Sequence, residues 1–381
     1  MKNDPNAWTG SDSERIEAAL DYAVKNGLPL EITRRQADDG RDHWLIDRAI
    51  RLPGGCTVRI RDCVLRLSDA CRDNFFRSAN CGYGIADIRP VSGIRILGEG
   101  NAVLRGAARP RATGDSGKTL GEHTFGTDAG KPGENPKGDW RNIGILFAYV
   151  DDFAIEGLQI EDPHAWSVSL EYCSHGRVRN MRFRSSGGIA VDGRRKTVLN
   201  QDGVDLRRGC HDIVIEDISG YTGDDLVALT ALPSSPTSPP TGTFWGTEIT
   251  RGGTGPDAEL HHVTIRRVHG WCAGGHHIVR LLNNRGVKLH DISIEDVADL
   301  SPEGLHDKAA LKIGDSNYGG AAPLGDTYAV TVRNLRSRSQ NGILCGGTLA
   351  DSTISGLVQE YAGGVAVNAA PGTLRNVEFL K

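Results

Sequence analysis

The sequence predicts an all-β protein built as a parallel β-helix, in which short strands wind into stacked coils and an N-terminal helix covers the first coil. An apolar-x-apolar-x-x-apolar-x-apolar pattern recurs after 23 residues, first at Phe153, Ile155, Leu158 and Ile160, then at Val178, Met181 and Phe183. Such fixed-period similarity indicates stacked repeats that are each too small to bury a core. Helical patterns between the strands, which a βαβ fold needs, are missing. A β-sandwich is the competing all-β architecture, but it would not explain the repeat.

The N-terminal helix is predicted over residues 11–27, SDSERIEAALDYAVKNG. Ser11 and Glu14 have the spacing of a capping box, and Gly27 stands where the residue after a helix C-cap belongs. The predicted buried face consists of Ile16, Leu20, Ala23 and Val24. Terminal caps of this kind cover the open end of a solenoid.

The coils that follow have strands of four to six residues, with Gly, Asn and Asp at the corners. In each pattern the two x-x residues are expected to form the bend between neighbouring sheets. We expect residues 1–381 to form one domain, interrupted by long insertions at 106–140 and 231–258. Loops this long are usually functional or disordered. In the second insertion, Phe244 and Trp245 suit a wall that stacks on sugar rings, or a local anchor in a flexible loop.

Composition excludes several classes of protein. The 44 basic and 48 acidic residues nearly balance, so no nucleic-acid or anionic-membrane partner is expected. No apolar run approaches the length of a membrane span. The N-terminus has no apolar signal region, which predicts a cytoplasmic protein if the chain is full length and a secreted or periplasmic one if a signal was removed. The eight cysteines are scattered without a CxxC pair, so buried free thiols are expected. The oligomeric state is not predicted.

A cluster of carboxylates is the main candidate for chemistry. Asp202 and the pair Asp224-Asp225 lie 22 residues apart, about one coil, and stacked parallel strands are ~4.8 Å apart. Acids at that distance repel, so at least one should hold its proton unusually strongly. One protonated acid beside ionised partners is what glycosidic-bond hydrolysis requires. The alternatives are ordinary Asx turns and a calcium site.

Four short motifs in order resemble those of the polygalacturonase family of glycoside hydrolases (family 28), which fold as right-handed, single-stranded parallel β-helices. They are Asn200-Gln201-Asp202, Gly223-Asp224-Asp225, Gly274-Gly275-His276 and Lys312. The resemblance covers residues 10–381 at the level of pattern, and its specificity lies in the order and spacing of the motifs.

The resemblance implies hydrolysis of O-glycosidic bonds in a pectic, galacturonate-containing polysaccharide or oligosaccharide, with inversion and without a metal or organic cofactor. Asp224 would be the general acid, and Asp202 with Asp225 would activate water. His276 would tune the cluster or contact the sugar. Asn200 would orient Asp202, and Lys312 would bind substrate beside the cleavage point. We further expect the two insertions to close the groove and favour exo attack on chain ends.

Two departures from the family pattern affect which sugar the site would accept. His277 stands where the family has Gly, and Ala310-Leu311-Lys312 replaces Arg-Ile-Lys. If His276 points outward, strand alternation predicts that Ile278 and Arg280 do so too and that His277 points inward. Arg280 would then supply the missing cation, or pair with a nearby acid. The same alternation argues that neither His261-His262 nor His276-His277 chelates one ion.

Two other functions remain open. One is a polysaccharide lyase or uronate epimerase on the same scaffold, which would use calcium or a basic residue. The other is a non-catalytic carbohydrate-binding β-helix such as an adhesin or tailspike module. Both would also have a carbohydrate partner, but simple binding does not need stacked acids.

Overall fold

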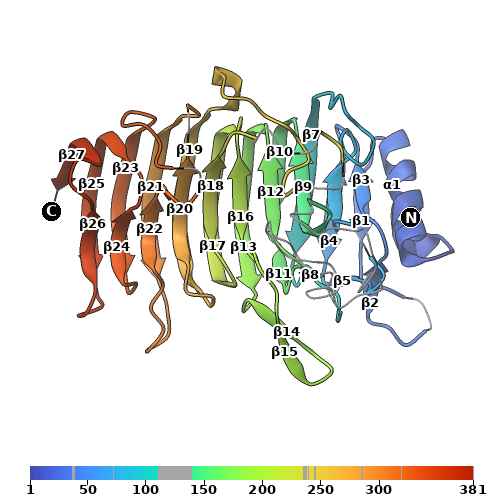
Figure 1. Cartoon of the computed structure of the whole chain (residues 1–381). Coiled ribbons are helices and arrows are strands. Elements are labelled where there is room, and N and C mark those ends of the chain that lie inside the picture. The colour runs from blue at the N-terminus through green and yellow to red at the C-terminus, as the bar shows by residue number, and fades with distance from the viewer. Residues whose placement is uncertain are drawn as a thin grey trace.

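The computed structural model describes residues 1–36, 39–71, 73–109, 140–234, 238, 240–243, 246–284, 286–318 and 320–380. In these residues the chain is a right-handed parallel β-helix with two long sheets and one α-helix (Figure 1). The stack runs from α1 at the N-terminal end to β26 and β27 at the C-terminal end. The predicted fold class is confirmed.

Sheet A, the larger sheet, has 15 strands. Most of them pair in one continuous row along the stack, and the other four, which are short, pair beside this row. Its strands are β1 (Leu30–Ile32), β2 (His43–Ile46), β4 (Thr57–Arg61), β5 (Val64–Leu67), β7 (Val91–Glu99), β8 (Val103–Arg105), β10 (Val150–Glu156), β11 (Gln159–Glu161), β13 (Ser174–Arg184), β17 (His211–Thr222), β19 (Leu260–Cys272), β21 (Leu289–Asp299), β23 (Thr327–Ser337), β25 (Leu349–Gln359) and β27 (Leu374–Leu380).

Sheet B has ten strands and is parallel throughout. Its strands are β3 (Ile50–Leu52), β6 (Phe76–Ser78), β9 (Ile145–Ala148), β12 (Val168–Glu171), β16 (Val204–Arg207), β18 (Val227–Ala231), β20 (His277–Asn283), β22 (Ala309–Ile313), β24 (Asn341–Cys345) and β26 (Val365–Ala369). A small antiparallel hairpin, β14 (Gly188–Val191) and β15 (Arg194–Thr197), projects from the stack (Figure 1).

The 23-residue repeat is confirmed by the register of the strands. Ile155 pairs with Val178, and Ile160 pairs with Phe183. The bend between the two halves of each pattern falls at a residue in the left-handed region, Gly157 (φ 71°) in one coil and Asn180 (φ 53°) in the next. Gly and Asn tolerate that conformation best, which explains why such residues occupy the x-x positions.

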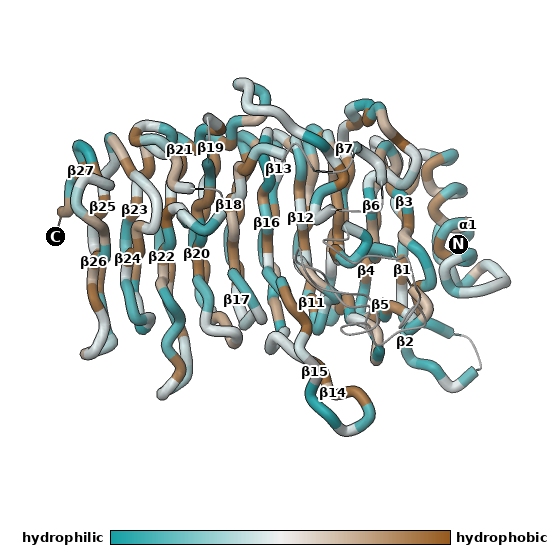
Figure 2. The backbone as a smooth tube through the Cα atoms, in the orientation of Figure 1, coloured by the Kyte–Doolittle hydropathy of each residue, from teal (hydrophilic) through white to brown (hydrophobic). Residues whose placement is uncertain are grey.

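The core consists of ladders of identical or similar side chains that stack from coil to coil. One ladder runs through five strands of sheet A, with every member fully buried: Ile155, Val178, Ile215, Ile265 and Ile294. Each such side chain contributes about 1.5–3 kcal/mol through burial. Apolar and polar residues alternate along the strands (Figure 2), as strands with one face on a core require.

Coil length varies where the predicted insertions interrupt the 23-residue repeat. His211 on β17 pairs with His261 on β19, a step of 50 residues, because the 231–258 insertion stands between β18 and β19 in the sequence. Parallel strands need register only where they pair, so loops of any length fit between them.

Helix α1 (Asp12–Lys25) begins at the capping box as predicted, with the Ser11 side chain accepting from the Glu14 amide. Ile16, Leu20 and Ala23 are buried against the first coil. Val24 is 43 % exposed, so its assignment to the buried face was wrong. It lies one residue beyond Ala23, about 100° around the helix.

All eight cysteines are free and buried, as expected. Among the helices of the described segments, none is long and apolar enough to cross a bilayer.

Candidate active site

The three aspartates of the carboxylate cluster lie in the turns that enter β16 and β18. Val204 on β16 pairs with Val227 on β18, a step of 23 residues. If the same 23-residue step is continued into the turns, Asp202 occupies the position on its coil that Asp225 occupies on the next. The 22-residue step had suggested that Asp224 occupies it. The Gly203 amide donates to the Asp225 carbonyl at 2.9 Å, and the Asp224 amide donates to the Gln201 carbonyl at 3.3 Å. The two turns therefore lie side by side on successive coils, and we call such neighbouring positions rungs.

Protons are distributed unequally over the cluster. Burial, followed by the charge of Asp225, raises the pKa of Asp224 to about 8. Burial and then the charges of Asp205, Asp224 and Asp225 raise the pKa of Asp202 well above its usual value. Burial also opposes ionisation of Asp225, but His277 and Arg280 outweigh it and hold the pKa of Asp225 below its usual value. At neutral pH the resting cluster therefore has Asp225 ionised and Asp224 protonated.

Two basic side chains hold Asp225, which is fully buried. The Nδ1 atom of His277 lies 2.7 Å from Asp225 Oδ1, and the His277 backbone amide donates to the same oxygen at 3.2 Å. Nη1 of Arg280 donates to Asp225 Oδ2 at 3.2 Å. Charged hydrogen bonds of this kind fix both the charge and the orientation of a carboxylate.

The neighbouring His276 contacts the other carboxylate. Its Nδ1 atom is 3.3 Å from Asp224 Oδ1, and its backbone amide contacts the Cys272 sulfur at 3.2 Å. Burial, only partly opposed by the charge of Asp225, lowers the pKa of His276 to about 4. The imidazole is therefore neutral at neutral pH and can donate or accept one hydrogen bond beside the acid.

Asp224, Asp225 and His276 also have the spacing of metal ligands. Among the residues that the structure describes, they form the group of three or more His, Cys, Asp or Glu residues whose ligand atoms could hold one ion. One ligand atom each from Asp224, Asp225 and His276 lie within 4.8 Å of one another. Two carboxylates and an imidazole would suit a divalent cation. The cluster thus has the donor set for a lyase-type cation as well as for acid–base catalysis, and a chelator test separates the two.

Strand alternation failed for two of the residues around His276. Ile278 is fully buried in the core instead of pointing outward, and His277 contacts Asp225 instead of the core. His276 belongs to the turn that precedes β20, in which Gly275 has a φ of 75°, so alternation cannot be counted across it.

Arg280 and Lys312 lie on adjacent strands as register partners. The Arg280 guanidinium stacks 4.7 Å from the Tyr318 ring centroid, and Lys312 Nζ lies 2.5 Å from Asp315 Oδ2. Arg280 thus sits beside Lys312 but is already paired with Asp225. Asp315 lies 4.0 Å from Arg280 as well and joins the two cations; it follows β22 in an irregular loop and had no sequence signal.

The remaining predicted residues support the turn or fall outside the described segments. Asn200 is buried with a left-handed backbone, φ 54°, directly before the cluster. Gln201, where the family has Thr or Ser, donates to the Pro163 carbonyl at 2.7 Å and accepts from the Gly187 amide at 2.9 Å. Trp245 and its neighbour Phe244 lie outside the described residues.

Asp205 is a buried acid that the motifs did not reveal. Burial raises its pKa to about 7, although Arg207 opposes the shift. Its Oδ1 atom lies 3.7 Å from Arg207 Nη2, and the Arg207 guanidinium lies 4.9 Å from the Trp166 ring centroid. A signal was present in the alternation Val204-Asp205-Leu206-Arg207, which puts two charged residues on the outer face of a strand beside Asp202.

A second apolar cluster covers the outer face of sheet B on the N-terminal side of the aspartates. We call it the wall; it consists of Cys81, Ile88, Trp140, Ile143, Leu146, Ala148, Ala165, Trp166 and Ile249. The buried Glu171 carboxylate ties the returning insertion to it, accepting from the Ile249 and Thr250 amides at 2.9 and 2.8 Å. Burial, then the charge of Glu248, raises the pKa of Glu171 to about 7.

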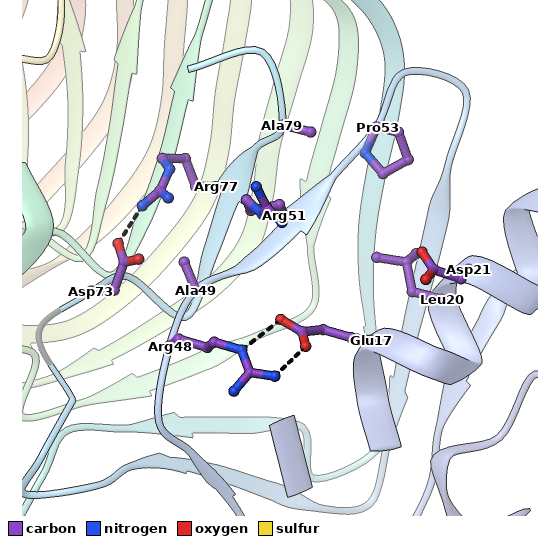
Figure 3. A pocket seen from close by; sticks show the side chains of 10 residues that line it. All are labelled: Glu17, Leu20, Asp21, Arg48, Ala49, Arg51, Pro53, Asp73, Arg77 and Ala79. Carbon is purple, nitrogen blue, oxygen red and sulfur yellow. Dashed lines mark hydrogen bonds and ion pairs between the residues drawn. The ribbon is translucent and has the colours of Figure 1, made fainter. Parts of the chain in front are cut away.

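A separate pocket of about 730 Å³ lies between α1 and the first strands of sheet B (Figure 3). Arg48 pairs with Glu17 at 2.5 Å and Arg77 with Asp73, while Arg51 lines the same space. None of the predicted site residues lines it. The aspartate cluster is the better candidate for chemistry, because its acids have strongly shifted pKa values in mutual contact.

Comparison with known proteins supports the architecture. No family model and no curated protein matches the chain. Among solved structures, the endo-xylogalacturonan hydrolase of Aspergillus tubingensis is similar with a TM-score of 0.54 and 15% identity, over 96% of this chain and 94% of that one. The family 28 exopolygalacturonase of Yersinia enterocolitica gives 0.51 and 12%, over 99% and 76%.

A tailspike protein mutant of E. coli bacteriophage HK620, in complex with a pentasaccharide, gives a TM-score of 0.50 and 15% identity, over 98% of this chain and 62% of that one. At such identities the likeness concerns the backbone. The chain therefore shares the right-handed parallel β-helix fold of these proteins.

Proposed function

We propose that the protein is a glycoside hydrolase that cleaves O-glycosidic bonds in a galacturonate-containing glycan, with inversion and from chain ends. The observation that carries the proposal is the contrast in surroundings of the two acids: His277 and Arg280 bind the buried Asp225, whereas Asp224 lies beside the imidazole of His276. Asp224, with a pKa of about 8, holds a proton that it can give to the leaving oxygen. Asp225 is held ionised by His277 and Arg280 and can accept a proton from water. Such a pair of unlike acids is the requirement of glycosidic hydrolysis.

The other residues take supporting roles. Asp202, on the neighbouring rung, hydrogen-bonds the attacking water and holds it beside Asp225, which takes the proton; the raised pKa of Asp202 favours its protonated form. His276 is neutral and contacts Asp224, so it donates or accepts a hydrogen bond without adding charge. Lys312 binds an acidic substituent of the sugar. Arg280, the register partner of Lys312, donates a hydrogen bond to Asp225 and favours its ionised form.

Exo attack is favoured by the wall. The wall covers sheet B next to Asp205 and Arg207, through the contact of Arg207 with Trp166. A polysaccharide that runs along sheet B would meet this obstruction on the N-terminal side, so only a chain end would reach the aspartates. The known β-helix hydrolases of similar fold include both an exo- and an endo-acting enzyme, so the fold alone does not decide this.

The inverting outcome comes from the family resemblance. In most inverting enzymes the two carboxyl groups are about 6.5–9.5 Å apart, which leaves room for water. One carboxylate oxygen each of Asp224 and Asp225 lie within 4.8 Å of one another, which is below this range, so we place the attacking water between the two neighbouring turns, beside Asp202 and Asp225. Proton NMR of the first-formed anomer tests this directly, since a retained anomer would contradict it.

The decisive experiment is a reducing-sugar screen across pectic and other acidic and neutral glycans. We expect new reducing ends with a galacturonate-containing substrate, and their loss in Asp224→Asn. The surface variant Asp87→Asn, whose side chain is 75% exposed, is the matched control. Binding without new reducing ends would support a carbohydrate-binding module. An unsaturated, ultraviolet-absorbing product, or loss of activity with a chelator, would support a lyase at the Asp224–Asp225–His276 group.

A further inference from the structure

Histidines gather on sheet A, away from the aspartates, which belong to sheet B. Four of the twelve histidines are involved. His211, His261 and His290 are register partners on β17, β19 and β21, and Tyr328 on β23 continues the row. Their rings stack at centroid distances of 5.0, 5.1 and 4.8 Å. We call this row the histidine ladder.

Each rung of the ladder carries a second side chain next to the ring. The residue after each histidine has a left-handed backbone: Asp212 (φ 54°), His262 (φ 52°) and Asp291 (φ 54°). This conformation breaks the alternation of a regular strand and brings neighbouring side chains to the same side. The argument that His261 and His262 must face opposite ways was therefore wrong.

The three rungs differ in what faces the ring. His211 Nδ1 lies 2.7 Å from Asp212 Oδ2, and His290 Nδ1 lies 2.6 Å from Asp291 Oδ2. In the middle rung a histidine replaces the acid, and the Nδ1 atoms of His261 and His262 are 2.6 Å apart. Two imidazole nitrogens that face each other either share one proton or share a cation.

The surroundings favour a cation. The middle rung lies between two rungs that carry carboxylates, Asp212 and Asp291, at the ~4.8 Å spacing of neighbouring strands. Glu259 lies 3.1 Å from His290 Nε2 and adds a third acid. Zn–N bonds are about 2.0–2.1 Å long, so tetrahedral coordination needs the two nitrogens only slightly further apart than they are. His262 is exposed and free to make that adjustment.

We propose that His261 and His262 bind one divalent transition-metal ion through their Nδ1 atoms, with water completing the coordination. Imidazole ligands select Zn²⁺, Cu²⁺ or Ni²⁺ over Ca²⁺ and Mg²⁺. The ion would fix the two histidines at the start of β19, and by binding only the folded chain it would stabilise the fold. The site does not depend on the function proposed for the aspartates.

The test is calorimetric titration of the tag-free full chain with Zn²⁺ and with Cu²⁺ at neutral pH, and with Ca²⁺ for comparison. We expect one Zn²⁺ per chain, tighter Cu²⁺ binding and no Ca²⁺ binding at this site. His261→Asn and His262→Asn should each raise the Kd by at least about 10–100-fold, the loss that even an outer-shell partner causes. Asn suits position 262 because it tolerates the left-handed backbone.

Two further variants make the result unambiguous. His306→Asn changes a half-buried histidine that stacks on Tyr361 elsewhere, and should leave the Kd unchanged. Asp224→Asn removes the metal-like group of the aspartate cluster and should also leave it unchanged. Electron paramagnetic resonance of the Cu²⁺ complex should show two coordinated imidazole nitrogens, and one in each single variant. Absence of saturable Zn²⁺ binding, binding insensitive to His262→Asn, or binding abolished by Asp224→Asn would overturn the proposal.

Discussion

The imidazole of His277 lies 2.7 Å from the carboxylate of Asp225, at a position where the family that the motifs resemble has glycine. This contact and the 3.2 Å hydrogen bond from Arg280 keep a fully buried carboxylate charged. A charged Asp225 in turn raises the pKa of Asp224 next to it. One residue outside the family pattern thus helps to set where the proton resides.

Replacing His277 with Gly should shift the acid limb of the pH–rate profile to higher pH. His277 and Arg280 hold the pKa of Asp225 below its usual value against burial, so losing the imidazole lets that pKa rise. A base that must be ionised then becomes active only at higher pH. The measurement is kcat/KM against pH, with His306→Asn as control. An unmoved acid limb would show that Arg280 alone maintains the charge.

Replacing Asp224 with Asn should lower kcat by about 10²–10⁴-fold, the usual contribution of a general acid, and leave folding intact. In the unmodified protein, activity should fall as pH rises through about 8, because Asp224 must be protonated to act. A nitrophenyl glycoside, whose leaving group needs no proton, should lose much less activity in the variant. Equal losses on both kinds of substrate would argue against the general-acid role.

Lys312→Ala should raise KM for a free-acid substrate by about 10–100-fold, the equivalent of one charged hydrogen bond. Arg280→Ala should instead destabilise the fold, by about 3–5 kcal/mol, because the buried Asp225 loses the guanidinium that binds its Oδ2. Comparing KM for free and methyl-esterified substrates in both variants checks this division. A KM effect of Arg280→Ala limited to the free acid, with normal stability, would assign substrate binding to Arg280.

Glu171→Ala should loosen the wall, because the carboxylate accepts from the amides of Ile249 and Thr250 in a buried site. Loss of these partners leaves donors unsatisfied, at a cost of about 1–3 kcal/mol. We expect the products to change from short, uniform fragments to mixed lengths, measured by chromatography early in digestion. The exposed-surface variant Glu360→Gln serves as control. If the unmodified protein already released fragments of mixed length early in digestion, that result would contradict exo action.

Ser11→Ala should lower the free energy of unfolding by about 1 kcal/mol, because Ser11 caps α1 and accepts from the Glu14 amide. Urea denaturation measures the effect. Activity of the remaining folded protein should be unchanged, since α1 lies at the end of the stack, several coils from β16 and β18, the strands that follow the aspartates (Figure 1).

Local patterns in the sequence were sufficient for the architecture. Ile155, Leu158 and Ile160 and their repeat 23 residues later determine which side chains face the core, and Ser11 with Glu14 determines where α1 begins. These features depend on residues close in the chain, whose periodicity directly reflects strand and helix geometry. The order of the acidic motifs likewise indicated that Asp202, Asp224 and Asp225 meet.

Only the tertiary structure decided how those acids interact. The one-residue difference in register that pairs Asp202 with Asp225, the turn that directs His277 to Asp225, and the contact of Asp315 with Arg280 all arise between distant segments. Left-handed residues such as Gly275 and His262 reverse the alternation of side chains, and alternation was the basis of the sequence prediction. Protonation depends on burial and on the charges of neighbouring coils, because electrostatic interactions act through space and are independent of separation along the chain.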